Sequence, residues 1–358
     1  MGDLQTGKSG KNVLNRFISK TLIFLCGVYW VVSFLFVPAL SASIVKVNAN
    51  SAIGFHWPYY LYTPAKVSSE HILVVPNNSP LVNDSFAYHQ NLALEQLNMW
   101  KTWADSLGTP LLVPIFPRFD DEYDGTIAPQ GLGRGTLETS IPSYSRIDLQ
   151  LIAMIEDIRH HFSTQGISLD GRMYFWGTSQ AGWFISRFVL LHPERVRAAA
   201  YGYVGWPAIP STSHKGFEMP YPYGLGGVSS LTRTEFDKNI FCQVPQFITC
   251  GELDNNTFGL PWYMGGDKEE FGTMFSTYFG TTTVSLHNSA KDIFYELGSI
   301  SIFKIYSGIG HTMTVAISQD ALNFLKSAPP LSIKPDLDTY NNEISNTLMP
   351  VFSIILDN

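Results

Sequence analysis

A serine lies in a run of small residues between a strand-like segment and a helix-like segment. Ser179 comes shortly after the apolar run Met173 to Trp176, and a predicted helix from about Gln180 to Leu191 begins directly after it. So tight a turn strains the serine backbone and projects its hydroxyl above the sheet, beside amides at the helix start that have no helical acceptor. A hydroxyl in this setting is suited to attack on an acyl carbonyl, because those amides can stabilise the oxyanion that forms.

The residues around Ser179 resemble the nucleophile elbow of the α/β-hydrolases. That pattern has glycine two residues before and two residues after the serine; here Gly177 fits, Ala181 takes the later place, and Gly182 follows. The stretch from Asp170 to Arg195, which ends in His-Pro-Glu-Arg, is similar to the esterase and poly(3-hydroxybutyrate) depolymerase branch of that family. The resemblance implies an α/β-hydrolase fold, carboxylic-ester hydrolysis, and a triad in the order serine, acid, histidine.

Two later strand-like segments end in candidate partners for the serine. The first, Gln246 to Cys250, runs into Gly-Glu-Leu-Asp-Asn-Asn, which is also similar to the acid loop of that branch. Asp254 is the preferred acid because it lies farther into this loop than Glu252, which stays the alternative. The second segment ends in Gly-Ile-Gly-His, and His311 is the one histidine of nine that directly follows the last predicted strand. We therefore predict a triad of Ser179, Asp254 and His311.

An oxyanion hole needs two hydrogen-bond donors near the serine. The first is assigned to the backbone amide of Gln180, at the start of the predicted helix. The second is expected in the loop after the strand-like run Ile72 to Val75, where many relatives have His-Gly and this chain has Asn77 and Asn78. Any amide other than that of proline can serve, so the choice between these two residues is open.

The elements that must position these residues follow an alternating pattern. Between residues 53 and 328, short β-branched or aromatic runs alternate with helical periods, which predicts an α/β fold with a largely parallel sheet and helices on both faces. The expected strands are Tyr59 to Tyr62, Ile72 to Val75, Leu111 to Phe116, Met173 to Trp176, Ala198 to Val204, Gln246 to Cys250 and Ile300 to Tyr306. The expected helices are about Phe86 to Leu107, Tyr144 to Phe162, Gln180 to Leu191 and Ala316 to Ser327.

Composition narrows the class of protein. The 358 residues are 45% hydrophobic and only 15% charged, with a net charge of −7, which is not the composition of a disordered chain. Lysine and arginine do not cluster beside stacking aromatic residues, so we expect no nucleic-acid partner. The three cysteines, Cys26, Cys242 and Cys250, form neither a disulfide framework nor a paired metal motif, and the predicted chemistry needs no metal or organic cofactor.

The two ends of the chain differ from its middle. An uncharged apolar run from Leu22 to Leu40 follows a basic segment, so residues 1–43 are expected to form a signal peptide or a membrane anchor that exports the rest. Secreted, periplasmic and anchored products all stay open, and membrane contact is expected only if the segment is not cleaved. Residues 44–328 are expected to form the catalytic domain, and residues 329–358 an extended tail.

The expected function is hydrolysis of small-molecule or polymeric carboxylic esters through an acyl-enzyme on Ser179. Two alternatives stay open, because a fold does not fix a function. One is a serine peptidase on the same fold, and the other is a noncatalytic binding protein that kept the fold. The interval from Trp206 to Cys242 is rich in aromatic residues and proline. It is expected either to wall a cleft for an apolar acyl or aryl group or to pack on the body of the domain.

Overall fold

The computed structural model describes residues 41–119, 127–256 and 268–330. Its strands are β1 (Ser43–Val47), β2 (Tyr59–Thr63), β3 (Ile72–Val74), β4 (Leu111–Pro114), β5 (Met173–Thr178), β6 (Val196–Gly202), β7 (Ser213–His214), β8 (Phe217–Glu218), β9 (Gln246–Gly251) and β10 (Ile302–Tyr306). Its α-helices are α2 (Phe86–Leu107), α3 (Gly135–Glu138), α4 (Ile147–Ser163), α5 (Gln180–Leu191), α6 (Val228–Thr232), α7 (Lys238–Gln243), α8 (Lys268–Phe279), α9 (Thr283–Glu296) and α10 (Val315–Ser327).

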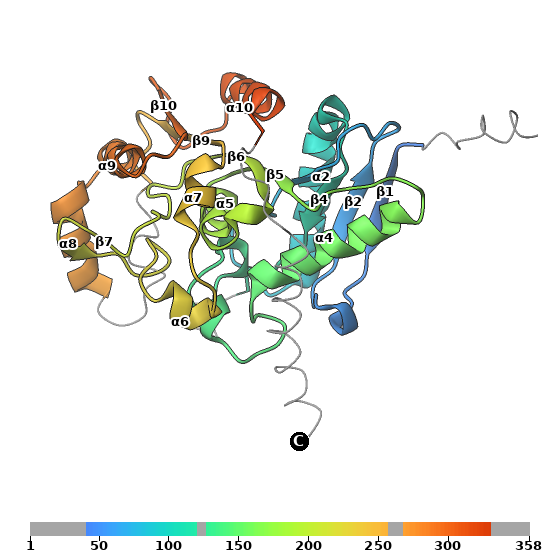
Figure 1. Cartoon of the computed structure of the whole chain (residues 1–358), viewed down its shortest axis with the longest axis horizontal. Coiled ribbons are helices and arrows are strands. Elements are labelled where there is room, and N and C mark those ends of the chain that lie inside the picture. The colour runs from blue at the N-terminus through green and yellow to red at the C-terminus, as the bar shows by residue number, and fades with distance from the viewer. Residues whose placement is uncertain (1–40, 120–126, 257–267, 331–358) are drawn as a thin grey trace, which may run out of the picture. The chain divides into compact units, whose positions relative to one another are not determined.

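Eight of the strands form one sheet, in the order β1-β2-β4-β3-β5-β6-β9-β10 (Figure 1). The six strands from β4 to β10 in this order are parallel to one another. Strand β2 runs antiparallel to both of its neighbours, β1 and β4. Strands β7 and β8 form a separate hairpin. The mostly parallel α/β sheet that the alternating pattern predicts is therefore confirmed.

Helices cover both faces of this sheet (Figure 1). On one face, α2 and α10 bury residues such as Leu97 and Ala321 against strand side chains that include Trp176 of β5. The rings of Trp103 and Trp176 lie 4.8 Å apart between α2 and β5. On the other face, Phe188 of α5 packs on Phe175 at 5.1 Å. Strand β5 is thus clamped from both sides, which holds the turn that follows it.

The predicted elements are present, with shifted ends that have local causes. Helices α2 and α5 have the predicted bounds. Helix α4 begins at Ile147 rather than Tyr144, because Arg146 has φ 48° and cannot belong to a helix. Strand β6 lies two residues earlier than predicted, since Tyr203 turns to φ 58° directly after Gly202. Strand β4 ends at Pro114, two residues before the predicted end.

Eight of the described strands and α-helices were not predicted from the sequence: β1, β7, β8, α3, α6, α7, α8 and α9. Strand β1 is an edge strand with four of its five residues exposed, so it lacks the apolar run on which the other strands were identified. Helices α8 and α9 were also missed, although α9 carries a capping box in which Thr282 and Ser285 exchange hydrogen bonds.

The predictions for the chain ends fall mostly outside the described residues. The apolar run Leu22 to Leu40 and the tail beyond residue 330 are not part of the described ranges. Among the helices that the structure describes, none combines the length and the apolar character needed to cross a membrane. Two cysteines, Cys242 and Cys250, are described, and both are buried thiols.

Candidate active site

Ser179 occupies the turn between β5 and α5 in a strained backbone conformation. Its φ and ψ are 57° and −125°, which a residue with a side chain adopts only when its surroundings impose it. Its backbone N–H donates to the carbonyl oxygen of Gly202 at the end of β6, at 2.9 Å. The turn is therefore tied to the neighbouring strand, and the predicted strand–turn–helix is present.

The small residues around Ser179 are required by close packing. A Cβ atom on Gly177 would lie 2.8 Å from the Cβ of Ala181 and 2.9 Å from Cδ1 of Ile185. A Cβ atom on Gly182 would lie 2.7 Å from the carbonyl oxygen of Gly202. Real Cβ atoms essentially never come so close. Alanine fits at position 181 because the residue that faces it, Gly177, has no side chain.

The structure brings together the three side chains predicted as a triad. Nε2 of His311 lies 3.2 Å from Oγ of Ser179, and Nδ1 of the same ring lies 3.0 Å from Oδ2 of Asp254. The Asp254 side chain is fully buried, whereas that of His311 is 30% exposed. The second carboxylate oxygen, Oδ1, accepts the backbone N–H of Asn256 at 2.9 Å. A buried carboxylate therefore orients the ring that faces the serine.

Glu252, the alternative acid, points elsewhere. Its Oε2 accepts hydrogen bonds from the hydroxyl of Ser307 and from the backbone N–H of Gly308. These two hydrogen bonds lower the pKa of Glu252. Because its carboxylate is engaged with the start of the following loop while His311 is bonded to Asp254, the structure favours Asp254 as the histidine's partner.

A glycine that sequence reasoning missed allows the acid loop and the histidine loop to touch. Strands β9 and β10 are parallel neighbours, so their carboxyl ends open at the same edge. At the end of β9, a Cβ atom on Gly251 would lie 2.6 Å from the carbonyl oxygen of Gly310. Two residues on, the N–H of Leu253 donates to the carbonyl oxygen of Ile309 at 2.8 Å. The signal available in the sequence was a glycine at a strand end just before the candidate acid.

Tyr203 contacts both the ring of His311 and the loop that carries it. Its ring meets that of His311 edge to face, with centroids 5.2 Å apart. Its hydroxyl donates to the carbonyl oxygen of Thr312 at 2.8 Å. Burial, with a contribution from the charge of Asp254, raises the pKa of Tyr203 to about 12. The hydroxyl is therefore protonated at neutral pH and stays a hydrogen-bond donor to the histidine loop.

The two asparagines predicted near the oxyanion hole have different surroundings. The side chain of Asn77 is buried and pairs with the backbone of Phe116, donating to its carbonyl oxygen at 2.8 Å and accepting its N–H at 3.0 Å. Asn78, in contrast, lines the cavity above Ser179. The side chain of Asn77 therefore has a structural role, and of these two residues only Asn78 lines the cavity beside Ser179.

The backbone amide of Asn78 is already engaged. It donates to Oε1 of Gln96 on α2 at 3.2 Å, and Nε2 of Gln96 donates back to the Asn78 carbonyl oxygen at 3.3 Å. The side-chain amide of Asn78 donates to the carbonyl oxygen of Thr178 at 3.1 Å, one residue before the nucleophile. Gln180 is the first residue of α5 and also lines the cavity. The first N–H groups of a helix have no acceptor within it, so the Gln180 amide has no hydrogen-bond partner inside α5.

Ser179 and His311 open into a cavity of about 940 Å³. Its described lining is Asn78, Pro80, Arg118, Thr178, Ser179, Gln180, Trp183, Tyr203, Asn255, Asn256, His311, Thr312 and Met313. None of these residues comes from the aromatic interval that begins at Trp206. Trp206 instead packs on Phe275 and Phe279 of α8, with ring centroids 4.8 Å away in both cases. Within the described residues, this part of the interval packs on the body of the domain.

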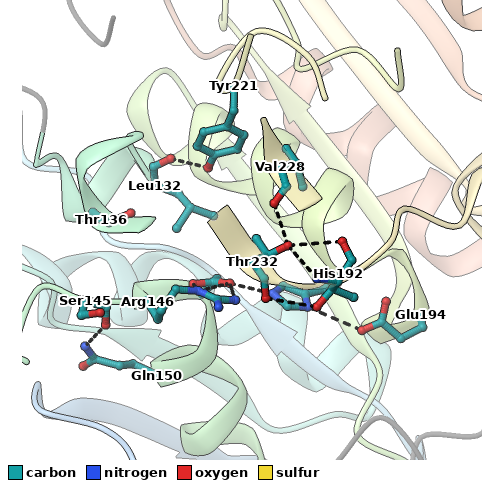
Figure 2. A network of polar contacts seen from close by, with 12 residues as sticks. Leu132, Thr136, Ser145, Arg146, Gln150, His192, Glu194, Tyr221, Val228 and Thr232 are labelled. Atoms are coloured by element: carbon teal, nitrogen blue, oxygen red, sulfur yellow. Dashed lines mark hydrogen bonds and ion pairs between the residues drawn. The ribbon is translucent and has the colours of Figure 1, made fainter. Parts of the chain in front are cut away.

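The His-Pro-Glu-Arg run forms a buried polar network at the far end of α5 (Figure 2). Nε2 of His192 lies 2.8 Å from Oδ2 of Asp148, which also binds Nη2 of Arg146 at 2.7 Å. Burial opposes the charge on both partners, yet their hydrogen bonds raise the pKa of His192 and, with Arg146, lower the pKa of Asp148. Arg195 binds Glu156 at 2.8 Å. The run thus ties α5 to α4, away from the cavity.

One group of potential metal ligands occurs among the described residues, outside the cavity. Donor atoms of Glu70, His71 and Asp170 lie within 4.8 Å of one another. Asp170, however, is already bound by Arg172, and its Oδ1 lies 2.8 Å from Nδ1 of His71. These residues precede β3 and β5, at the edge of the sheet opposite Ser179. We interpret the group as an ion-pair cluster that joins the starts of two strands.

Comparison with known proteins agrees with this architecture. No protein-family model and no curated protein matches the chain. Among solved structures, it resembles poly(aspartic acid) hydrolase-1 from Sphingomonas sp. KT-1, with a TM-score of 0.51 and 18% identity over 80% of this chain and 98% of that one. The chain has the α/β-hydrolase fold. A poly(3-hydroxybutyrate) depolymerase from Bordetella parapertussis is more distant, with a TM-score of 0.47 and 15% identity over 86% of this chain and 93% of that one.

Proposed function

We propose that this protein is a serine hydrolase that cleaves carboxylic esters. The observation that carries the proposal is the chain of contacts from the buried Asp254 carboxylate through His311 to the Ser179 hydroxyl, with distances of 3.0 and 3.2 Å. The hydroxyl lies at a strained turn and faces a cavity large enough for a substrate. The base is thus within hydrogen-bond distance of both the nucleophile and the orienting acid.

Acylation follows from these contacts. Oγ of Ser179 forms a bond to the ester carbonyl carbon while Nε2 of His311 takes the hydroxyl proton and the carbonyl π electrons move to oxygen. Asp254 stabilises the resulting imidazolium through Nδ1. The bond from carbon to the alkoxy oxygen then breaks, and His311 gives its proton to the leaving alcohol. A water molecule repeats both steps on the acyl-enzyme and releases the acid.

Two donors stabilise the tetrahedral oxyanion in this proposal. One is the backbone N–H of Gln180. The other is the side-chain amide of Asn78, since the backbone amide of that residue is bonded to Gln96. An amide nitrogen carries two hydrogens, and Thr178 accepts one of them. The second is then available to the cavity, where a donor of this kind is worth about 3–4 kcal/mol in the transition state.

Active-site labelling tests the proposal. A fluorophosphonate probe should label the folded wild-type protein at Ser179, and Ser179→Ala should abolish both labelling and hydrolysis of 4-nitrophenyl esters with little change in Tm. Peptide anilides assayed beside the esters separate an esterase from a peptidase. A folded protein that neither reacts with the probe nor hydrolyses any of these substrates would refute the proposed function and support the noncatalytic alternative.

We further propose that residues 1–43 direct export. The support is the sequence alone: a basic segment followed by the apolar run Leu22 to Leu40. Fractionation of expressing cells tests the export, and the electrophoretic size of the mature protein tells cleavage from anchoring. Recovery of the full-length chain in the cytosolic fraction would overturn this proposal.

A further inference from the structure

Arg118 places a permanent positive charge in the cavity that holds Ser179. The residue is half-buried and follows β4 by four positions. Its Nη1 donates to the carbonyl oxygen of Ser79 at 2.5 Å, and its backbone N–H lies 3.3 Å from Nε2 of His89. These contacts hold the guanidinium group against the cavity wall.

Within the described residues, no carboxylate forms an ion pair with Arg118. Five other arginines do pair with acidic side chains, namely Arg134, Arg146, Arg159, Arg172 and Arg195. A guanidinium has five N–H donors, and the Ser79 carbonyl accepts from only one of its nitrogens. Since no carboxylate of the described residues neutralises this half-buried cation, a ligand that supplies an anion can bind to it with a gain in free energy.

The rest of the described lining also favours a negatively charged group. No aspartate or glutamate is among the described lining residues, and Asp254, which holds His311, is fully buried with its oxygens bonded to His311 and Asn256. The lining includes Asn255, whose side-chain amide is a hydrogen-bond donor. The chain as a whole carries a net charge of −7, which is opposite in sign to the charge of Arg118.

We propose that the preferred substrates are esters that carry a separate carboxylate group, and that Arg118 binds this carboxylate. This inference rests on the proposed function, because it concerns the same cavity. Arginine and carboxylate match in shape and form two parallel hydrogen bonds, which makes the pair both strong and directional. The carboxylate can belong to the acyl part or to the alcohol part of the ester, and the experiment separates the two.

Two matched pairs of esters test the proposal. For the acyl side, 4-nitrophenyl hydrogen adipate is compared with 4-nitrophenyl hexanoate, and for the alcohol side, 4-(hexanoyloxy)benzoate is compared with phenyl hexanoate. In the wild type, the charged member of one pair should have the higher kcat/KM. For that pair, Arg118→Gln should lower the ratio of kcat/KM for the charged ester to kcat/KM for the neutral ester by about 10- to 100-fold. This is the effect of losing a charge-assisted hydrogen-bonded pair. Arg118→Lys keeps the charge and should lose less.

A second measurement does not depend on the variants. In the wild type, added sodium chloride should lower kcat/KM for the charged ester more than for its neutral counterpart, because salt screens the attraction. A ratio that is the same in the wild type and in folded Arg118→Gln, or a ratio that salt leaves unchanged, would overturn the inference. If the wild type gives either of these results but still hydrolyses the esters, the proposed function stands and only the role of Arg118 is refuted. If the wild type hydrolyses none of the four esters and does not react with the fluorophosphonate probe, the proposed function itself is refuted.

Discussion

Replacing Asp254 by asparagine tests the proton relay most directly. The substitution keeps the size and shape of the side chain but removes the negative charge 3.0 Å from Nδ1 of His311. It also introduces an N–H donor that favours the wrong tautomer of the ring, in which Nε2 carries the proton and cannot accept the one from Ser179. Because the carboxylate is fully buried, water cannot replace the lost interaction.

The size of the effect follows from this geometry. An imidazolium and a carboxylate with charge centres about 4 Å apart attract by about 4 kcal/mol at an effective dielectric constant near 20. This energy corresponds to a factor of about 10³ in rate. The unfavourable tautomer adds to the loss, so we expect kcat to fall by about 10³ to 10⁴. KM should change little, since Asp254 lies behind the histidine and does not line the cavity.

Glu252→Gln is the matched control. It removes a carboxylate from the same loop, two residues away, whose partners are Ser307 and Gly308. Because its carboxylate bonds to these residues and His311 bonds to Asp254, kcat should stay within about twofold of the wild type. The assay is steady-state hydrolysis of a 4-nitrophenyl ester, with Tm measured for each variant. If folded Asp254→Asn keeps more than about a tenth of the wild-type kcat, or if Glu252→Gln loses as much, the relay is assigned to the wrong acid.

Three further predictions test the supports of the site. Asn78→Ala keeps the backbone amide and loses the side-chain donor, so kcat should fall by about 10² to 10³; a near-normal kcat would assign the oxyanion to a backbone amide instead. Gly251→Ala should lower the free energy of unfolding by about 1–3 kcal/mol in urea titrations, because its Cβ would collide with the histidine loop. Gly310→Ala, with a contact of 3.8 Å, is its control and should unfold near the wild-type midpoint. His192 has a raised pKa in the folded state, so its stabilising effect should be complete below the unfolded pKa of 6.5 and lost as pH rises through the folded value. His192→Asn should remove this pH dependence of Tm. A variant whose Tm depends on pH as in the wild type would contradict this prediction.

The elbow could be predicted from the sequence because its constraints are local. Ser179 must turn sharply between a strand and a helix, and residues within three positions of it provide the space: Gly177, Ala181 and Gly182. The same holds for helix α5, whose bounds match the prediction at both ends. Asp254 and His311 could also be predicted, since parallel strands bring the loops that follow them to one edge of the sheet.

The choice between Asn77 and Asn78 as a candidate oxyanion donor could not be made from the sequence, because the surroundings of these residues are not local. Whether the backbone amide of Asn78 is available depends on Gln96, which lies 18 residues later on α2. The burial of Asn77 depends on Phe116, 39 residues away. Neither contact follows from periodicity or from a motif. The same reason applies to Arg118, whose place in the cavity depends on the order of β3 and β4 in the sheet.

The order of the strands also divides the site into two parts with separate tasks. Strand β5 carries the nucleophile; β3 and β4, which precede Asn78 and Arg118, lie on one side of it, and β9 and β10, which precede Asp254 and His311, lie on the other. In the proposed mechanism, the first side would stabilise and select negative charge, and the second side would move the proton. Effects of residues with separate tasks and no shared partner add, usually within about 0.5 kcal/mol. With the charged ester, the losses in kcat/KM of Arg118→Gln and Asp254→Asn should therefore multiply in the double variant, and a double variant no slower than Asp254→Asn alone would show that the two sides act as one unit.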